Sequence, residues 1–393
     1  MGDALRIHGP HDRNARLALL DGWWDRDVVR ESRVGVVGIG ALGNEILKNL
    51  ALLDFRKVVL FDKDTVEMSN LSRSVMFRAS NEGDLKVAAA AASLVELNPD
   101  VEPEAIPGDV MFEVGLGRLR ELDVVIAGLD SRHVRWWLNR TARALGVPWV
   151  EGATEGAHGH AMPFLPDVGP CYECSFTDLD WAALDQVASC RQLQLDASAQ
   201  GRVATSPTMA SIIGGAQVHF AMDLLHGRAL EGGRSLLFNL AAPDLLVSGR
   251  RENPECDAHF AWSPIMETDL ASRSTVGELV ALGAGEVGAP CTIELRWDLV
   301  WELRCYDCND TTTVRRPRGL VKFSDAVCPK CRGERIPALI HRLDAETHGE
   351  FRLEEVGIPT FDIIEVRGPR GSVWLELTGD RRRESSAGDE MIP

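Results

Sequence analysis

The sequence contains no long hydrophobic run: none of its apolar stretches approaches the roughly 18 residues that a membrane-spanning helix requires. The first residues, MGDALRIHGPHDRNARL, mix charged residues with His and Pro and lack the apolar core of a signal peptide. We therefore expect a cytoplasmic protein without a membrane partner.

Basic residues are also few, because 42 Lys and Arg stand against 59 Asp and Glu and give a formal net charge of −17. A nucleic-acid-binding protein needs a basic face for the phosphates. The sequence therefore argues against nucleic acid as the main partner, while a local basic pocket for a nucleotide stays compatible with it.

What is present is an ordinary globular composition, with 45% hydrophobic and 26% charged residues. A chain of 393 residues is too long for one compact core of typical size, so we expect a large domain with a smaller appendage.

Alternating patterns predict the fold of the large domain. Short apolar runs indicate buried strands, and apolar residues at helical spacing indicate helices. We expect strands at 33–38, 57–61, 122–127 and 148–152, and helices at 41–53, 84–97 and 131–145. This alternation predicts an α/β fold with a Rossmann-like doubly wound parallel sheet.

The remaining chain sets the predicted domain boundaries. Residues 163–204 are irregular, 207–226 fit a long helix and 234–249 fit two strands. We predict a first domain at 1–263, a linker at 264–290, a β-rich C-terminal domain at 291–378 and a disordered tail at 379–393.

A glycine-rich turn of the form G-x-G-x-x-G joins the first strand to the first helix. It consists of Gly38, Ile39, Gly40, Ala41, Leu42 and Gly43. Such a turn lets the backbone approach phosphate at a helix N-terminus. Asp62 ends the next strand, where a carboxylate accepts hydrogen bonds from ribose hydroxyls. These features alone suit an NAD-dependent oxidoreductase equally well.

The residues that follow resemble one family. Residues 62–73, DKDTVEMSNLSR, closely resemble the D-x-D-x-V-E-x-S-N-L-x-R segment of the ubiquitin-activating, ThiF, MoeB and HesA enzymes. Residues 83–87, GDLKV, and 128–131, GLDS, resemble two further motifs of that family. The resemblance extends over roughly residues 13–260.

The resemblance implies adenylation of a carboxylate by ATP. Arg73 and Lys86 would supply positive charge around the phosphates, where negative charge is crowded. Asn70 would supply a neutral hydrogen bond, Asp130 would hold Mg²⁺, and Asp64 would join the nucleotide-binding set.

An arginine near the N-terminus is implied to act across a homodimer. Residues 13–19, RNARLAL, loosely match the family's R-Y-x-R-Q-I-x-L, in which the second Arg reaches the triphosphate of the partner subunit. Here that residue is Arg16, although the aromatic residue and Gln of the pattern are missing. An ordinary solvated Arg is the alternative.

Paired cysteines predict two structural zinc sites, because C-x-x-C pairs in a chain without an export signal favour metal over disulfide. The resemblance implies that the first site is completed by a segment containing a His. Its ligands are Cys171, Cys174, Cys256 and His259. The spacing itself indicates the second site, a zinc ribbon. Its ligands are Cys305, Cys308, Cys328 and Cys331. The alternatives are an unmetallated surface His259 and a redox cysteine pair.

Ubiquitin activators also form a thioester on an exposed cysteine of low pKa. Once the zinc ligands are set aside, Cys190 and Cys291 remain. Cys190 lies in the segment about 176–204, where relatives place a crossover loop, and Arg191 follows it. The family's usual loop cysteine position is Ala199 here, so an unreactive Cys190 stays open.

We therefore predict an activating enzyme for a ubiquitin-like protein, with thioester transfer and hand-off to a conjugating enzyme. Bacterial ubiquitination-like operons of antiviral defence encode such enzymes, and the Ala- and Arg-rich composition is compatible with that source. The alternatives are adenylation only, of a sulfur-carrier protein or peptide, an NAD-dependent oxidoreductase, and a non-catalytic scaffold.

Overall fold

The computed structural model describes residues 12–20, 22–188, 205–228, 230, 232–242 and 244–381. The chain divides into two compact units, which are described separately. Unit 1 comprises the described residues of Met1–Gly108, Glu121–Phe176 and Val203–Phe260, and unit 2 comprises those of Asp109–Arg120, Thr177–Arg202 and Ala261–Pro393.

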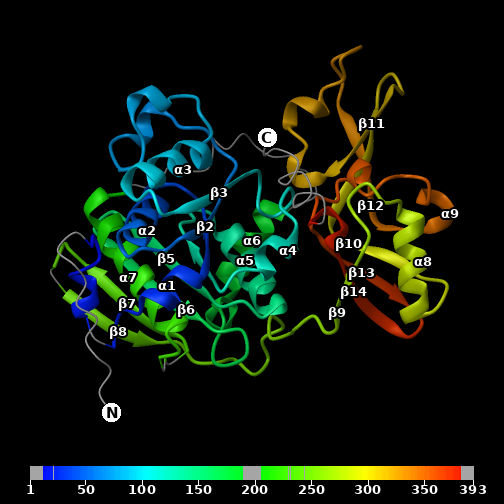
Figure 1. Cartoon of the computed structure of the whole chain (residues 1–393). Helices are drawn as coiled ribbons and strands as arrows, with labels where there is room; N and C mark the ends of the chain where they lie inside the picture. Colours follow the sequence, from blue (N-terminus) through cyan, green and yellow to red (C-terminus); the bar gives the residue numbers. More distant parts are fainter. Residues whose placement is uncertain are drawn as a thin grey trace, which may run out of the picture. The chain divides into compact units, whose positions relative to one another are not determined.

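Unit 1 is built on an eight-stranded sheet with the order β3-β2-β1-β4-β5-β6-β7-β8 (Figure 1). Its strands are β1 (Arg33–Val37), β2 (Lys57–Asp62), β3 (Glu102–Pro107), β4 (Val124–Ala127), β5 (Trp149–Glu155), β6 (His158–Phe164), β7 (Arg234–Asn239) and β8 (Asp244–Gly249). The strands from β3 to β5 are parallel, and β6, β7 and β8 continue the sheet as antiparallel neighbours. The carboxyl ends of the parallel strands therefore meet at one edge, where ligands bind in open α/β sheets.

Helices cover this sheet on both faces. They are α1 (Arg26–Glu31), α2 (Ala41–Leu52), α3 (Lys86–Leu97), α5 (Arg132–Leu145) and α7 (Pro207–Leu225). The main core lies between α2, α3, α7 and the strands, and contains fully buried Ile46, Leu50, Leu94 and Ile213. The central strand β1 has buried Val34, Val36 and Val37, as expected for a strand covered on both faces.

Unit 2 is built on a six-stranded sheet with the order β11-β10-β13-β14-β9, and β12 pairs with β10. Its strands are β9 (Ile265–Thr268), β10 (Thr292–Cys305), β11 (Thr311–Pro317), β12 (Arg335–Leu343), β13 (Ile363–Gly368) and β14 (Gly371–Leu377). Its helices are α4 (Leu116–Arg120), α6 (Asp178–Ala188), α8 (Val276–Val287) and α9 (Ala345–His348). The apolar face of α8 packs on this sheet through Leu279 and Val280.

The segment 109–120 belongs to unit 2, although it lies between β3 and β4 of unit 1 in the sequence. Buried Asp362 accepts a hydrogen bond from the Leu116 backbone, with an N–O distance of 3.1 Å, and fully buried Glu376 pairs with Arg120. A Cβ on Gly115 would lie 1.9 Å from the carbonyl oxygen of Thr360, so the backbones approach too closely for any side chain there. This segment is therefore tightly fixed within unit 2.

The predicted mixed α/β class, with a second sheet domain that contains a cysteine cluster, is confirmed. The expected parallel pairing holds from β3 to β5, and beyond it the hairpin of β5 and β6 continues the sheet with antiparallel strands. The expected linker at 264–290 is also wrong, since it contains β9 and α8 of unit 2. Most of the predicted tail at 379–393 lies outside the described residues.

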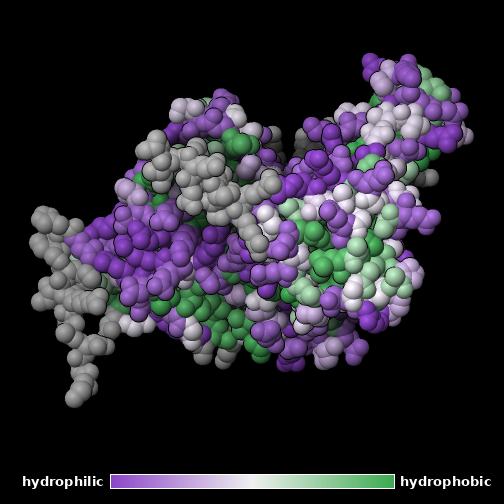
Figure 2. Space-filling model, turned by 45° about the vertical axis from the view of Figure 1, so that its right-hand side comes forward, coloured by the Kyte–Doolittle hydropathy of each residue, from purple (hydrophilic) through white to green (hydrophobic). Residues whose placement is uncertain are grey.

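The surface is mainly hydrophilic on the face that Figure 2 presents, with hydrophobic residues gathered in separate patches. Within the part of the chain that the structure describes, no helix combines the length and apolar character needed to cross a membrane.

Candidate nucleotide site and metal centres

The glycine turn between β1 and α2 is closed by backbone contacts that exclude side chains. Gly38 has φ +88°, a conformation that L side chains rarely adopt. A Cβ on Gly43 would lie 2.1 Å from the Gly38 carbonyl oxygen, so only glycine fits there. A Cβ on Gly40 would meet no atom within 4 Å, which indicates open space at the N-terminus of α2. The turn therefore has the shape that phosphate binding requires.

The end of β2 is joined to this turn and to Lys86 by a chain of polar contacts. The Ile39 backbone donates to one carboxylate oxygen of Asp62 at 2.6 Å, and the Asp64 backbone donates to the other at 2.8 Å. Asp64 pairs in turn with the Lys86 ammonium at 2.9 Å. Burial raises the pKa of Asp62, while the positive charge of Lys86 opposes that rise. The structure thus brings Asp62, Asp64 and Lys86 to one edge of the glycine turn.

Asp130 lies on the other side of the turn, just beyond the end of β4. Gly128 packs so closely on the turn that a Cβ there would lie 2.5 Å from the Gly38 carbonyl oxygen. Asp130 follows two residues later and is exposed. It makes no hydrogen bond or ion pair to any other residue that the structure describes. Ser131 then caps α5 by accepting from the Val134 backbone.

The loop with Asn70 and Arg73 is attached to the turn by Asn44. Asn70 accepts a hydrogen bond from the Glu67 backbone at 3.0 Å, and Arg73 donates to the Ser69 carbonyl at 2.9 Å. Fully buried Asn44 donates to the carbonyls of Ile39 and Gly40 and accepts from the Met76 backbone at 2.8 Å. The interpretation of the sequence missed Asn44, although an amide inside an apolar helix pattern is a usable signal.

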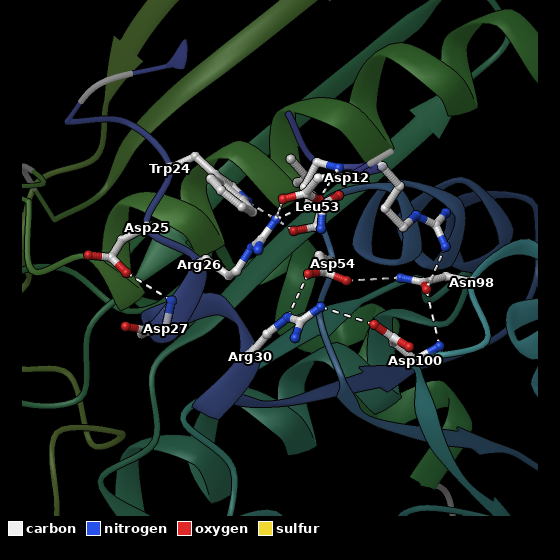
Figure 3. A network of polar contacts seen from close by, with 12 residues as sticks. Asp12, Trp24, Asp25, Arg26, Asp27, Arg30, Leu53, Asp54, Asn98 and Asp100 are labelled. Atoms are coloured by element: carbon white, nitrogen blue, oxygen red, sulfur yellow. Dashed lines mark hydrogen bonds and ion pairs between the residues drawn. The ribbon is translucent and has the colours of Figure 1, made fainter. Parts of the chain in front are cut away.

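The turn that carries Arg16 is fixed at the opposite end of α2 from the glycine turn. Arg13 donates to Asn98 at 2.6 Å, and Asn98 donates to the Ala51 carbonyl near the last residues of α2. Figure 3 shows the same network continuing through Asp54, which pairs with Arg30 at 2.6 Å. In Figure 3 Trp24 also donates to the Leu53 carbonyl, and Arg26 pairs with Asp12.

The length of α2 therefore separates Arg16 from the phosphate-binding end of that helix. Twelve helical residues span about 18 Å. Arg16 itself is exposed, and its side chain makes no hydrogen bond or ion pair with another described residue.

The first predicted metal cluster is assembled in unit 1. The ligand atoms of Cys171, Cys174, Cys256 and His259 lie within 4.8 Å of one another. The sulfur of Cys171 lies 3.6 Å from that of Cys256 and 3.7 Å from that of Cys174. Tetrahedral zinc with Zn–S bonds of about 2.3 Å separates its sulfur ligands by about 3.8 Å, so the group fits zinc.

Neighbouring side chains orient this cluster. The free ring nitrogen of His259 lies 3.4 Å from a Glu252 carboxylate oxygen, and such a carboxylate fixes a ligand imidazole. Glu173, inside the C-x-x-C turn, is buried and paired with Arg140 of α5 at 2.8 Å. Burial raises the pKa of the Cys171 thiol to about 12, so a bound metal is what would favour its thiolate.

The second predicted cluster is assembled in unit 2 by the end of β10 and the loop before β12. Its ligand atoms, from Cys305, Cys308, Cys328 and Cys331, also lie within 4.8 Å of one another. Cys305 and Cys331 have their sulfurs 3.4 Å apart, and Cys308 and Cys328 have theirs 3.7 Å apart. Four thiols at these distances again fit a closed, structural zinc site.

The two remaining cysteines differ in what can be said of them. Cys190 and the predicted crossover loop around it lie outside the described residues, apart from residues 176–188. Cys291 is buried immediately before β10, and burial raises its pKa. It therefore lacks the exposed, low-pKa character that a covalent nucleophile requires.

The fold and site define an α/β protein with a glycine turn of the kind that binds nucleotides and a cysteine–histidine cluster that could hold a metal ion. The chain belongs to the ThiF family, whose family model matches residues 11–258.

Relatives by sequence are named as activating enzymes. The chain is 33% identical over 253 residues to the "SAMP-activating enzyme E1" of Haloferax volcanii, covering 62% of this chain and 87% of that protein. It is 35% identical over 149 residues to the "NEDD8-activating enzyme E1 catalytic subunit" of Schizosaccharomyces pombe, covering 37% of this chain. The matched region is only 33% of that longer relative's length.

Solved structures support the fold alone. Escherichia coli MccB with AMPCPP and MccA matches with a TM-score of 0.54 at 16% identity, over 64% of this chain and 75% of that chain. MccB with succinimide matches with the same TM-score at 17% identity, over 63% of this chain and 74% of that chain.

Proposed function

We propose that this protein uses ATP to adenylate the C-terminal carboxylate of a ubiquitin-like protein. The observation that carries the proposal is the continuous set of contacts from the glycine turn through Asp62 and Asp64 to Lys86, with the end of β4 packed on the same turn. Membership of the ThiF family and relatives named as SAMP- and NEDD8-activating enzymes favour adenylation over hydride transfer.

The reaction needs charge neutralisation more than proton transfer. A substrate carboxylate is already ionised at neutral pH, so its oxygen attacks the α-phosphorus of ATP directly. The new O–P bond forms as the bond from that phosphorus to the β-phosphate oxygen breaks, and pyrophosphate leaves. Negative charge is concentrated there, and fixed cations and N–H groups stabilise it.

Each residue then has a role that fits its position. Asp62 would accept from the ribose hydroxyls, the glycine turn would cradle phosphate, and Lys86 and Arg73 would face the developing charge. Asp130 would hold Mg²⁺, which suits an exposed carboxylate that makes no ion pair with another described residue. The metal would neutralise phosphate charge when bound.

A homodimer would complete this site with Arg16. Its turn lies at the end of α2 away from the phosphates, so Arg16 would serve a second copy. The edge strand β8 has all six residues exposed, including Leu245, Leu246 and Val247, and would suit pairing between copies. Leu246→Glu should then lower the mass measured by light scattering, whereas Val95→Glu, at an exposed position of α3, should not.

A second step would transfer the acyl group to Cys190. Its thiolate would attack the acyl carbon, AMP would leave, and a conjugating enzyme would take the product. The competing proposal stops at the adenylate of a peptide or sulfur carrier, and the fold shared with peptide-bound MccB favours it. Cys190→Ala separates the two proposals, because only the first predicts that this variant loses an adduct that thiols cleave by acyl exchange while pyrophosphate exchange is retained.

The activity is tested by ATP–pyrophosphate exchange with small proteins that end in Gly. Exchange that depends on both the carrier and its free C-terminal carboxylate supports the proposal. A carrier with an amidated C-terminus is the control and should give none. Absence of exchange with every carrier, together with NADH binding, would overturn the proposal.

A further inference from the structure

The strands β4 and β5 separate just where the site begins. Their pairing stops at Ile126 and Val150, although β4 extends to Ala127 and β5 to Glu155. Beyond that point β5 still pairs with β6 and Ala127 with β1, but the carbonyls that face the gap between β4 and β5 have no ladder partner across it. Unpaired buried carbonyls are costly, so side chains or water must satisfy them.

Gln217 of α7 satisfies two of these carbonyls from one face of the sheet. It is fully buried, and its amide nitrogen donates to the Ala127 carbonyl at 2.8 Å and to the Val150 carbonyl at 3.3 Å. A Cβ on Gly152 would lie 2.3 Å from the carboxamide carbon of Gln217. Glycine at that position is therefore what lets the amide reach both strands.

Arg135 of α5 satisfies the next two carbonyls from the other face. One of its terminal nitrogens donates to the Leu129 carbonyl and, at 3.2 Å, to the Gly152 carbonyl. Its other terminal nitrogen lies 3.6 Å from the carboxylate of Glu151, whose neighbour Gly152 faces Gln217. Successive strand residues face opposite sides, so the two bridges lie on opposite faces.

Glu151 holds the guanidinium in place. It is 1% exposed, and its second carboxylate oxygen lies 2.7 Å from His160 of β6. Arg135 itself is 11% exposed. The charge of the guanidinium is paired with Glu151 and one terminal nitrogen donates to two carbonyls, while its buried Nε has no hydrogen-bond partner among the described residues.

We propose that Arg135 and Gln217 are positioning residues. By bridging the end of β4 and β5 they fix the separation of these segments and so set the position of Asp130. The inference rests on the proposed function for its meaning, because Leu129, which Arg135 holds, immediately precedes Asp130. Neither residue touches a reacting atom. Both act through the backbone of residues 127–129.

Amide hydrogen exchange of the full chain tests the geometry without any activity. In Arg135→Met, amides within residues 128–131 should exchange about tenfold to hundredfold faster, as expected for losing one or two charge-assisted hydrogen bonds. In Gln217→Met the same amides should exchange about threefold to tenfold faster than in wild type. In Arg135→Lys their exchange rate should lie between those of wild type and Arg135→Met. Arg132→Met on α5 and Ser211→Ala on α7 are the controls and should leave these amides unchanged.

Pyrophosphate exchange then separates positioning from a loss of folding. Arg135→Met should lower kcat by about tenfold to hundredfold, because a small misplacement costs that much. The KM for ATP should stay within about twofold, since the glycine turn and Asp62 are untouched.

Unchanged exchange of amides 128–131 in Arg135→Met would overturn the inference, as would faster exchange spread evenly over unit 1. If the wild-type chain shows no pyrophosphate exchange with any carrier, the proposed function falls. The amide measurement still decides the positioning role in that case.

Discussion

The contribution of the Lys86 charge to the proposed reaction can be measured separately from its contribution to folding. Its ammonium is bound to Asp64, and its side chain is 12% exposed. Lys86→Met keeps the aliphatic stem and removes the cation. We expect the kcat of pyrophosphate exchange to fall by about 10²- to 10³-fold, the usual cost of removing one group that stabilises transition-state charge.

Lys57 provides the matched control for that measurement. It is exposed at the first residue of β2, and among the described residues its ammonium donates to the Glu31 carbonyl alone, at 3.3 Å. Lys57→Met should retain the full rate of ATP–pyrophosphate exchange. Equal losses in the two variants would show that the effect of Lys86 is general and would contradict its assigned role.

Glu151 predicts an acid sensitivity of folding. Burial alone raises its pKa, but the hydrogen bond and charge of His160 and the charge of Arg135 outweigh burial and bring the pKa below 4.5. Between that lowered pKa and 4.5 the unfolded chain binds a proton that the folded chain does not. The free energy of unfolding should therefore fall as the pH falls through this range, and the contribution of Glu151 is complete above it.

Urea unfolding of Glu151→Gln at pH 7 and pH 4 checks this expectation. The substitution should cost about 3 kcal/mol at pH 7, because Arg135 stays buried without its carboxylate. The deficit relative to wild type should shrink at pH 4. Glu155→Gln, exposed on the same strand, is the control, and a deficit that does not change with pH would contradict the assignment.

At the scale of elements, the two cysteine clusters are separate predictions about metal content. We expect about two zinc ions per chain, since each cluster offers one tetrahedral set. Cys305→Ser and His259→Ala should each remove one zinc, measured by atomic absorption. Buried Cys291 belongs to neither cluster, so Cys291→Ser should retain both ions. Loss of both ions from any single variant would indicate general unfolding instead.

The sequence predicted elements best where their signals are local. The glycine turn from Gly38 to Gly43 and the helix that follows it are determined by neighbouring residues, and α2 begins and ends within one residue of the expectation. Strand β3 was missed because it lies at the sheet edge and contains Pro103 and Pro107, which strands tolerate only at edges.

The supporting residues of the site were harder to predict. Arg135 and Gln217 bind backbone carbonyls on strands far from them in sequence, so no local pattern marks their role. The two clusters of cysteine pairs could be predicted because thiol ligands are rare and their spacing is itself the signal. The end of strand β2 at Asp62 could also be predicted, because polar residues there follow a run of buried ones.

At the scale of the whole molecule, the segment 109–120 makes unit 1 discontinuous in sequence. A Cβ at Gly115 would contact backbone atoms of Thr360 and Phe361, which cannot move aside as side chains do. We expect Gly115→Ala to cost about 1–3 kcal/mol of unfolding free energy and to make this segment more sensitive to proteases.

Thermal unfolding and limited proteolysis check that expectation. Gly285→Ala in α8 is the matched control within the same unit, because a Cβ there meets no atom within 4 Å. It should stabilise the helix by about 1 kcal/mol. Equal behaviour of the two variants would show that the close approach at Gly115 is not a constraint.

The same segment imposes an order on biosynthesis. Leu116 leaves the ribosome 246 residues before Asp362, the carboxylate that receives its backbone N–H. At typical elongation rates that interval is about 12–50 s, during which β3 and β4 are already translated but the peptide between them lacks its binding site. Nascent chains halted before Asp362 should therefore expose Leu116 and Leu119 to chaperones, and only completion of the last strands withdraws them.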